Sequence, residues 1–432
     1  MTPTTAGLAL LVIVAAWLLS LDHYLTTYAK PYASVSHDKV DHDKRIQVPV
    51  QKSNGEGLFI VAGGCGFTGS WIVRYLIMRG ERNVVVWDRK QKLPNDIRGS
   101  TTLDSIDLTS RDHVSQALKR VHQKVTQASK VVVFNCAARI EQHRSSYFGD
   151  NIAIATNLRD VLTDSKIKDK TVMVHIGDSI STTKPVNWLN YWNRSNWVQN
   201  SSPDLDDHNL HSRHVNTYAY TMHAAESILL NSDIVCASLR PHGFISGHLG
   251  DSFLTPALHH DGGLMHSPNV PVFLINVEDV AIGALCLEDK LANKDACPSV
   301  NHRAFSLAPL DHISFEGMYN RIRALRDFRV IRIQPVVVLV ISYIIGLYRL
   351  FIREVYLSTR EQCLLSGIAQ TLTPQRFSVL QTVKLPLNEN TKRTSQLIGY
   401  NCQWTAAQTV DAVVLEHEKL REEMKQKETA ES

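Results

Sequence analysis

A cluster of glycines constrains the architecture of this chain more than any other feature. The short apolar run at residues 58–62 is followed by Gly63, Gly64, Gly66 and Gly69, and a helical pattern of apolar side chains then continues to Arg79. Glycine adopts backbone conformations that other residues avoid, and it lets two backbones approach closely. The segment therefore predicts a strand, a tight turn and a helix whose N-terminus can bind an anionic group.

The alternation of short apolar runs and helical patterns continues downstream. It is typical of βαβ units, in which parallel strands are buried between helices. The expected strands are residues 83–87, 131–135 and 171–176, and the expected helices are residues 114–125 and 152–162. We therefore predict an α/β fold: a Rossmann-type doubly wound parallel sheet, with a smaller C-terminal substrate region and an N-terminal membrane helix.

An acidic residue ends the second expected strand. Asp88 follows Gly69 by nineteen residues, and in dinucleotide-binding units an acid at this distance binds the ribose hydroxyls. The residues expected to hold the pyrophosphate are Gly63, Gly66, Phe67, Thr68 and Gly69. Because a carboxylate repels a 2′-phosphate, NAD is the expected cofactor. Arg89, directly beside the acid, leaves NADP as an alternative.

Three further residues are expected to contact the cofactor. Asp107 lies where a third strand would end, near the adenine ring. Asn135 and Ala137 close the fourth strand, where small side chains allow the cofactor to approach the backbone. Taken alone, each of these is more often a turn or core residue than a ligand contact.

An uncharged apolar run lies near the N-terminus, at residues 6–21. It is short for a span of about 20 residues, although Tyr24 and Leu25 could extend it. No basic residue precedes it, unlike the start of a cleaved signal peptide. Because Lys30 and Lys39 follow it, we predict a single-pass anchor with the catalytic domain in the cytosol. A signal peptide and a buried helix are the alternatives.

Composition divides the chain into five expected segments. Residues 1–25 are a membrane anchor helix, 26–56 a polar tether, 57–330 the NAD(P)-binding Rossmann domain with substrate-region elements, 331–356 a membrane-associating apolar helix, and 357–432 a C-terminal substrate-region segment with a charged tail. The apolar run at 335–348 is too short to span a bilayer. An interfacial or re-entrant helix and a buried core helix both stay open.

Overall composition excludes several classes of protein. Hydrophobic residues make up 44% of the 432 residues and charged residues 20%, which argues against extensive disorder. A net charge of +4 is too weak for a nucleic-acid partner. The seven cysteines have no C-x-x-C spacing, so neither a disulfide framework nor a metal site is expected.

The glycine cluster, Asp88, the sequence Asn135-Cys-Ala-Ala and the later Leu239-Arg-Pro together resemble the extended short-chain dehydrogenases. Over residues 57–415 they look most like the 3β-hydroxysteroid dehydrogenase and sterol 4α-carboxylate 3-dehydrogenase branch. The resemblance implies NAD(P)-dependent oxidation or reduction of a hydroxyl or ketone on an apolar sterol, steroid or terpenoid-like substrate. It also implies a location at the endoplasmic reticulum membrane, and it allows a homodimer.

The resemblance further implies a catalytic tyrosine, a serine that holds the substrate oxygen, and a lysine four residues after the tyrosine. Tyr218 and Ser179 match the first two, with Ser181 as a fallback, and Tyr218 is also expected to touch the cofactor. Met222 stands at the lysine position, and Asp178 adds a negative charge nearby. A tyrosine with a pKa of about 10 is a poor base at neutral pH without an adjacent cation.

Met222 therefore leaves three interpretations. The tyrosine and serine favour an enzyme, whereas the missing lysine favours a cofactor-binding pseudoenzyme, and a non-redox reaction on the same fold also stays open. His223 could supply a positive charge, but on a helix its side chain points about 100° away from that of Met222.

Overall fold

A parallel sheet of seven strands lies at the centre of the structure, a computed structural model that describes residues 3–27, 55–139, 149–182, 214, 217–265, 268, 271–337, 340 and 394–431. In their order across the sheet, the strands are β3 (Thr102–Ser105), β2 (Val84–Asp88), β1 (Gly57–Ala62), β4 (Lys130–Asn135), β5 (Thr171–Ile176), β6 (Val235–Pro241) and β11 (Ala304–Leu307). All neighbouring strands pair in parallel, which confirms the predicted fold class. The strand order reverses between β1 and β4, where such sheets bind ligands.

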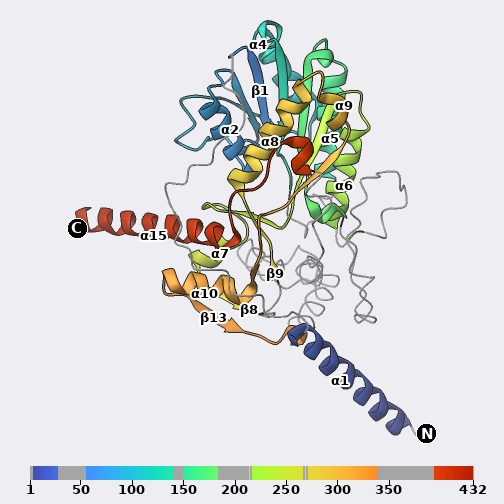
Figure 1. The fold of residues 1–432 in the computed structure, drawn as a ribbon, viewed down its shortest axis with the longest axis vertical. Coiled ribbons are helices and arrows are strands. Elements are labelled where there is room, and N and C mark those ends of the chain that lie inside the picture. Colours follow the sequence, from blue (N-terminus) through green and yellow to red (C-terminus); the bar gives the residue numbers. More distant parts are fainter. Residues whose placement is uncertain are drawn as a thin grey trace.

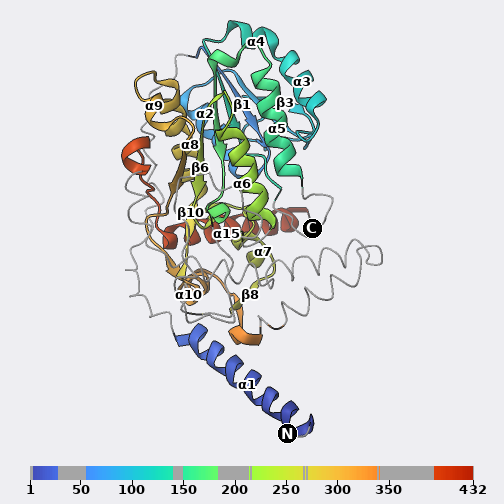
Figure 2. The ribbon, with the colours of Figure 1, turned by 90° about the vertical axis from the view of Figure 1, so that its right-hand side faces the viewer.

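Helices cover both faces of the sheet (Figures 1 and 2). One face packs on α2 (Phe67–Arg79) and α8 (Val277–Ala292), and the other packs on α3 (Arg111–Arg120), α5 (Asp150–Thr163) and α6 (Thr217–Leu230). Successive side chains of β1 alternate between the two faces and are all fully buried. Burial on both faces explains why the strands read as continuous apolar runs in the sequence.

The prediction of a single helix at residues 114–125 is wrong in one respect, because the chain forms two helices there. α3 ends at Arg120 and α4 (His122–Gln127) begins two residues later. The residue between them, Val121, has φ −91° and ψ 9°. Val121 and Val125 both pack into the same buried cluster. Their spacing of four fits a straight helix equally well, so the apolar pattern does not reveal the bend.

A smaller region lies between the sheet and the N-terminal helix (Figure 1). Its short strands pair as β7 (Phe244–Ser246) with β10 (Leu274–Asn276), β8 (Gly262–Met265) with β13 (Arg329–Arg332), and β9 (Pro271–Val272) with β12 (Ile313–Ser314). Its helices are α7 (Leu254–His259), α10 (Phe315–Leu325) and the first half of α15 (Ala406–Glu431), which share one buried cluster. Shorter helices elsewhere are α9 (Cys297–Val300), η2 (Lys168–Lys170) and η3 (Ser179–Thr182).

The C-terminal helix begins earlier than its charged sequence indicates. The charged stretch beyond Val414 belongs to α15, whose first turns are apolar, and Val410, Val413 and Val414 are fully buried. From Lys419 onward most of its residues are exposed, and Figure 1 shows this end projecting from the molecule. The helix is therefore anchored by its apolar first half.

The N-terminal apolar run forms the helix α1 (Pro3–Thr27). Its residues 6–23 have a mean hydropathy of 1.9, and only 6% of that window is buried. By length and composition α1 can cross a membrane, although a signal sequence has the same properties. Most of the expected tether at 26–56 and most of the apolar run at 335–348 lie outside the described residues.

A buried ion network joins the two helices on one face to the sheet. Glu288 of α8 is fully buried and accepts hydrogen bonds from Arg79 of α2 at 2.7 Å and from Lys130 of β4 at 2.6 Å. Arg79 also lies 2.8 Å from Glu81. Removing one partner from such a network leaves buried charges uncompensated.

We expect Glu288→Gln to lower the free energy of unfolding by about 3 kcal/mol, because Arg79 and Lys130 lose their shared carboxylate. Denaturant unfolding of the full chain in detergent measures this change. Asp289→Asn, at the neighbouring exposed position, is the matched control and should change little. Equal effects of the two substitutions on the free energy of unfolding would contradict a stabilising role for the Glu288 ion network.

Candidate functional site

The glycine turn brings three backbone segments into contact. Gly63 has φ +78°, and a Cβ there would lie 2.7 Å from the backbone nitrogen of Ala137, which follows β4. A Cβ on Gly69 would lie 2.3 Å from the carbonyl oxygen of Gly63. Both positions therefore require glycine, because α2 packs directly beneath the turn and the end of β4 packs beside it.

The N-terminus of α2 is shaped to receive an anion. Its N-cap is Gly66, and no side chain within the described residues caps this end. A Cβ on Gly66 would meet only the carbonyl oxygen of Gly63, at 3.1 Å. The first turn of α2, which contains Phe67 and Thr68, therefore carries backbone N–H groups and the positive end of the helix dipole without a capping side chain among the described residues. These features fit the pyrophosphate of a dinucleotide.

Asp88 lies at the end of β2, as the sequence predicts, and it also supports the turn. Its Oδ2 accepts a hydrogen bond from the backbone N–H of Cys65 at 2.9 Å, and its Oδ1 accepts one from the N–H of Lys90, also at 2.9 Å. The Lys90 ammonium in turn donates to the Cys65 carbonyl at 3.2 Å. Sequence reasoning missed both contacts to Cys65, because that residue reads as a variable position within the glycine pattern.

Two of the other expected cofactor residues lie together at the end of β4. The Asn135 Oδ1 accepts a hydrogen bond from the Ala137 N–H at 3.3 Å, and its Nδ2 lies 3.2 Å from Nδ1 of His175 on β5. Asn135 is thus held against the neighbouring strand, with 1% of its surface exposed. Asp107 is exposed, and it lies two residues beyond the end of β3. Its carboxylate accepts hydrogen bonds from Thr109.

The expected catalytic tyrosine meets a carboxylate. The Tyr218 hydroxyl, on α6, donates to Asp178 Oδ2 at 3.1 Å. Burial raises the pKa of Tyr218 well above its usual value, and the negative charge of Asp178 raises it further. Burial also raises the pKa of Asp178 to about 6. Ser179 and Ser181 follow directly on η3, both buried, and η3 packs against α6.

Met222 occupies a buried position four residues beyond Tyr218 on the same helix, with 2% of its surface exposed. His223 does not replace the absent cation, because burial lowers its pKa and favours the neutral ring. Its ring lies 5.1 Å from that of His214. The described surroundings of the tyrosine therefore carry a negative charge where the resemblance implies a positive one.

A buried ion pair lies behind this site. Arg240 of β6 donates from Nε to both carboxylate oxygens of Glu226 at 3.0 Å, and Glu226 also accepts from Ser238. Glu226 and Arg240 are 1% and 5% exposed. A Cβ on Gly177 would lie 3.1 Å from Glu226 Oε1, so the strand end before Asp178 packs directly on the pair. The pair therefore positions the turn that carries Asp178 and Ser179.

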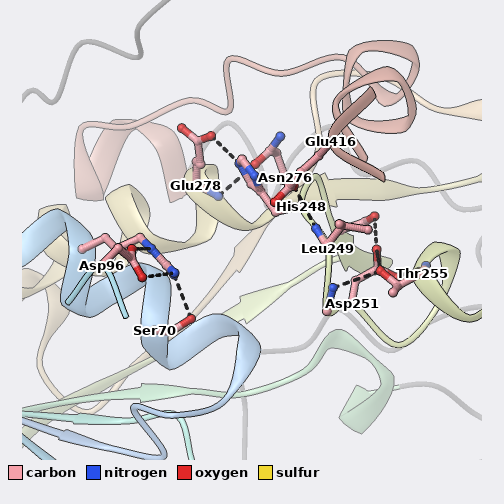
Figure 3. A network of polar contacts seen from close by, with 12 residues as sticks. Ser70, Asp96, His248, Leu249, Asp251, Thr255, Asn276, Glu278 and Glu416 are labelled. Carbon is pink, nitrogen blue, oxygen red and sulfur yellow. Dashed lines mark hydrogen bonds and ion pairs between the residues drawn. The ribbon is translucent and has the colours of Figure 1, made fainter. Parts of the chain in front are cut away.

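A second polar cluster ties the C-terminal helix to the nucleotide-binding unit (Figure 3). His248 lies between Glu278 of α8, 2.7 Å from its Nε2, and Glu416 of α15, 3.1 Å from its Nδ1. Its ring also stacks on Trp71 of α2, with centroids 4.0 Å apart. Burial alone would lower the pKa of His248, but the hydrogen bonds and charges of the two carboxylates outweigh burial and raise it. Two acceptors on one imidazole require both ring nitrogens to carry protons.

We expect Gly69→Ala to weaken dinucleotide binding roughly tenfold or more, because relieving a contact of this kind costs about 1–3 kcal/mol. Titration calorimetry with NAD measures the change. Gly99→Ala is the matched control, since a Cβ at Gly99 meets no atom within 4 Å. Unchanged affinity in Gly69→Ala would show that the turn does not contact the cofactor.

The His248 cluster predicts a pH-dependent contribution to stability. Because the folded-state pKa of His248 is raised, its contribution is complete below the unfolded-state pKa and is lost as the pH rises through the folded-state value. We expect the difference in unfolding temperature between the unmodified chain and His248→Gln to be largest below the unfolded-state pKa of histidine, about 6.5, and to shrink as the pH rises above it. His122→Gln, at an exposed position, should show no such trend. A difference that is constant with pH would mean that the ring is neutral.

Comparisons with known proteins agree with this geometry. Residues 59–241 match the profile of the NAD dependent epimerase/dehydratase family, and no curated protein matches the sequence significantly. Among solved structures, Pal from Bacillus thuringiensis is 14% identical with a TM-score of 0.57, covering 84% of this chain and 99% of that one. The Bordetella bronchiseptica enzyme WbmG, solved with NAD and UDP, is 11% identical with a TM-score of 0.54, covering 84% and 94%.

The terminal R domain of the myxalamid biosynthetic pathway is 14% identical, with a TM-score of 0.58 and coverage of 85% and 91%. At such identities these structures share the fold alone. The family match, by contrast, covers every strand from β1 to β6 and the glycine turn. Residues 59–241 therefore resemble the NAD dependent epimerase/dehydratase family, and the expected cofactor, NAD, agrees with this match.

Proposed function

We propose that the chain is a membrane-anchored, NAD-dependent oxidoreductase that interconverts a hydroxyl and a ketone, of the 3β-hydroxy type, on an apolar sterol, steroid or terpenoid-like substrate. The observation that carries this proposal is the hydrogen bond from Tyr218 to Asp178, at the carboxyl end of β5 and beside Ser179. This hydrogen bond supports a proton donor and a proton acceptor in series at the edge of the sheet where a dinucleotide is expected.

The side chains near this edge support an apolar substrate. Phe244 and Phe253 stack with ring centroids 4.0 Å apart, and they pack with Leu249 against the core of the smaller region. Arg240, on the neighbouring strand, is buried and bound to Glu226, so its charge is already compensated. Half-buried aromatic rings suit a sterol or terpenoid skeleton better than they suit a diphosphate, which requires cations.

The protein's contribution to the reaction is a proton relay. Bound NAD supplies the hydride acceptor during oxidation. Ser179 orients the substrate hydroxyl, Tyr218 accepts the hydroxyl proton on its phenolic oxygen, and it passes its own proton to the Asp178 carboxylate. Asp178 then releases the proton to solvent, and in the reducing direction the same steps run in reverse. The substrate loses one hydride and one proton, so the reaction balances.

This relay explains how a tyrosine can act without a lysine. The raised pKa of Tyr218 disfavours a free tyrosinate, but a concerted transfer never forms one. The terminal acceptor is Asp178, whose pKa of about 6 leaves it ionised at neutral pH. Oxidation therefore requires ionised Asp178 and should be lost as the pH falls below about 6.

We expect the purified chain to reduce NAD with a panel of 3β-hydroxysterols, followed by absorbance. Tyr218→Phe should lower kcat by about a hundredfold or more, because it removes a positioned acid/base. Asp178→Asn should lower kcat and abolish the rise of kcat/KM through about pH 6. Cys297→Ser, on α9, is a control that should retain activity. An unmodified rate that survives Tyr218→Phe would contradict the relay.

A second candidate function is an NAD-binding pseudoenzyme, and buried Met222 favours it. The variant Met222→Lys separates the two. Turnover by the unmodified chain supports the oxidoreductase. Binding of NAD without turnover, together with activity that appears only in Met222→Lys, would mean that the pocket persists while catalysis has been lost. A non-redox reaction on this fold would instead leave the NAD absorbance unchanged while converting substrate.

We further propose that α1 is an uncleaved anchor in the endoplasmic reticulum membrane, with the nucleotide-binding unit in the cytosol. The apolar surface of α1 supports this placement, since only 6% of its central window is buried. The basic residues that follow the helix in the sequence support the cytosolic orientation. The homodimer stays a prediction.

A further inference from the structure

The two-stranded ribbon of β8 and β13 presents an apolar outer face. The strands pair in register, with Ile331 opposite Leu264 and Arg329 opposite Gly262. Ile331 and Leu264 are 47% and 37% exposed. Because side chains alternate along a strand, these paired residues share one face, together with Arg329. Leu264 and Ile331 therefore form a small exposed apolar pair on one face of the ribbon.

The opposite face of the ribbon is packed. Met265 is 3% exposed and belongs to the buried cluster of the smaller region. Tyr319 of α10 donates to the Leu264 carbonyl at 3.2 Å, and its ring fills the space beside Gly263. The ribbon is therefore fixed on α10 and cannot turn its exposed side chains inward.

The ribbon lies where α1 leaves the molecule. Figures 1 and 2 both show the end of α1 beside the segment that follows β13. Asp22 Oδ1 accepts a hydrogen bond from the Val336 N–H at 3.2 Å, and Leu21 is fully buried there. Val336 is only four residues beyond the end of β13. The ribbon is therefore only a few residues along the chain from the place where α1 would enter a bilayer.

One arginine shares the face of the apolar pair. Arg329 is exposed and precedes Ile331 by two residues on β13, whereas Arg332 is paired with Met265 and bonds to Glu316 of α10 on the packed side. Apolar side chains that enter the headgroup boundary, flanked by cations that attract anionic lipids, characterise surfaces that lie on membranes.

We propose that the outer face of the β8–β13 ribbon rests on the phospholipid bilayer that α1 enters, with Leu264 and Ile331 at the headgroup boundary and Arg329 on anionic headgroups. A bilayer fits this face because β13 leads within four residues to the contact with α1, and because the face carries Arg329 beside its apolar pair. The inference rests on the proposed membrane anchor but not on the proposed catalysis. It turns the smaller region toward the lipid.

The test uses the full chain in vesicles of equal parts phosphatidylserine and phosphatidylcholine that carry a nitroxide lipid. An environment-sensitive fluorescent amino acid replaces Leu264, Ile331, Leu11 or Leu420 one at a time by amber suppression. Leu11 lies in α1 and Leu420 is a comparably exposed residue of α15, 42% exposed. We expect strong quenching at Leu11, intermediate quenching at Leu264 and Ile331, and none above background at Leu420. Arg329→Glu should weaken quenching at Leu264.

Each outcome decides the proposal. Quenching at Leu11 with none above background at Leu264 and Ile331 would overturn the ribbon contact while the anchor stands. Absence of quenching at all four positions would overturn both the anchor and the ribbon contact. Equal quenching at Leu420 would mean that the label reports general lipid adsorption, which also rejects a specific surface. None of these measurements depends on catalytic turnover. Failure of the proposed activity is therefore distinguishable from failure of the proposed membrane contact.

Discussion

The close backbone contact between Gly63 and Gly69 is the constraint on which the rest of the nucleotide-binding unit depends. It fixes the angle at which α2 leaves the sheet, because a Cβ at Gly69 would lie 2.3 Å from the Gly63 carbonyl oxygen. It also brings the turn against Ala137 at the end of β4, where the strand order reverses. Asp88 then holds the turn from β2 through the Cys65 N–H. One arrangement of backbones therefore determines both the packing of α2 and the position of its N-terminus, which is the expected site of a pyrophosphate.

The chemistry of the site depends on the sign of the charge beside Tyr218. A lysine at the position of Met222 would stabilise a tyrosinate, whereas Asp178 opposes its formation. Tyr218 is consequently a poor base by itself. It could still pass a proton on, since its hydroxyl already donates a hydrogen bond to the Asp178 carboxylate at 3.1 Å. The buried Glu226–Arg240 pair has no net charge, so it positions the strand end without restoring a cation. In the proposed oxidation, this arrangement would favour concerted proton transfer over a stepwise one.

The parallel sheet could be predicted from the sequence because strands buried on both faces are uninterrupted apolar runs, and β5 matches its expected range in full. The glycine turn and Asp88 were also predictable, since their spacing is local. Contacts between distant segments were not: His248 and Glu416 are 168 residues apart, and nothing in either neighbourhood marks the other. The short strands β8 and β13 were missed for the same reason, because each gains its pairing only from the other.

The first turn of α8 explains how the smaller region keeps its place relative to the cofactor. Asp279 is fully buried and accepts hydrogen bonds from the Tyr400 hydroxyl at 2.6 Å and from the Gln403 N–H at 2.9 Å, so it holds the chain that leads into α15. The preceding residue, Glu278, binds His248 and also accepts from Tyr75 of α2 at 2.6 Å. Two adjacent carboxylates therefore hold the C-terminal segment on one side and the cofactor-binding helix on the other. A displacement of α15 would break the contacts of Asp279 and those of Glu278 at once. The smaller region and the nucleotide-binding unit are therefore coupled through the first turn of α8.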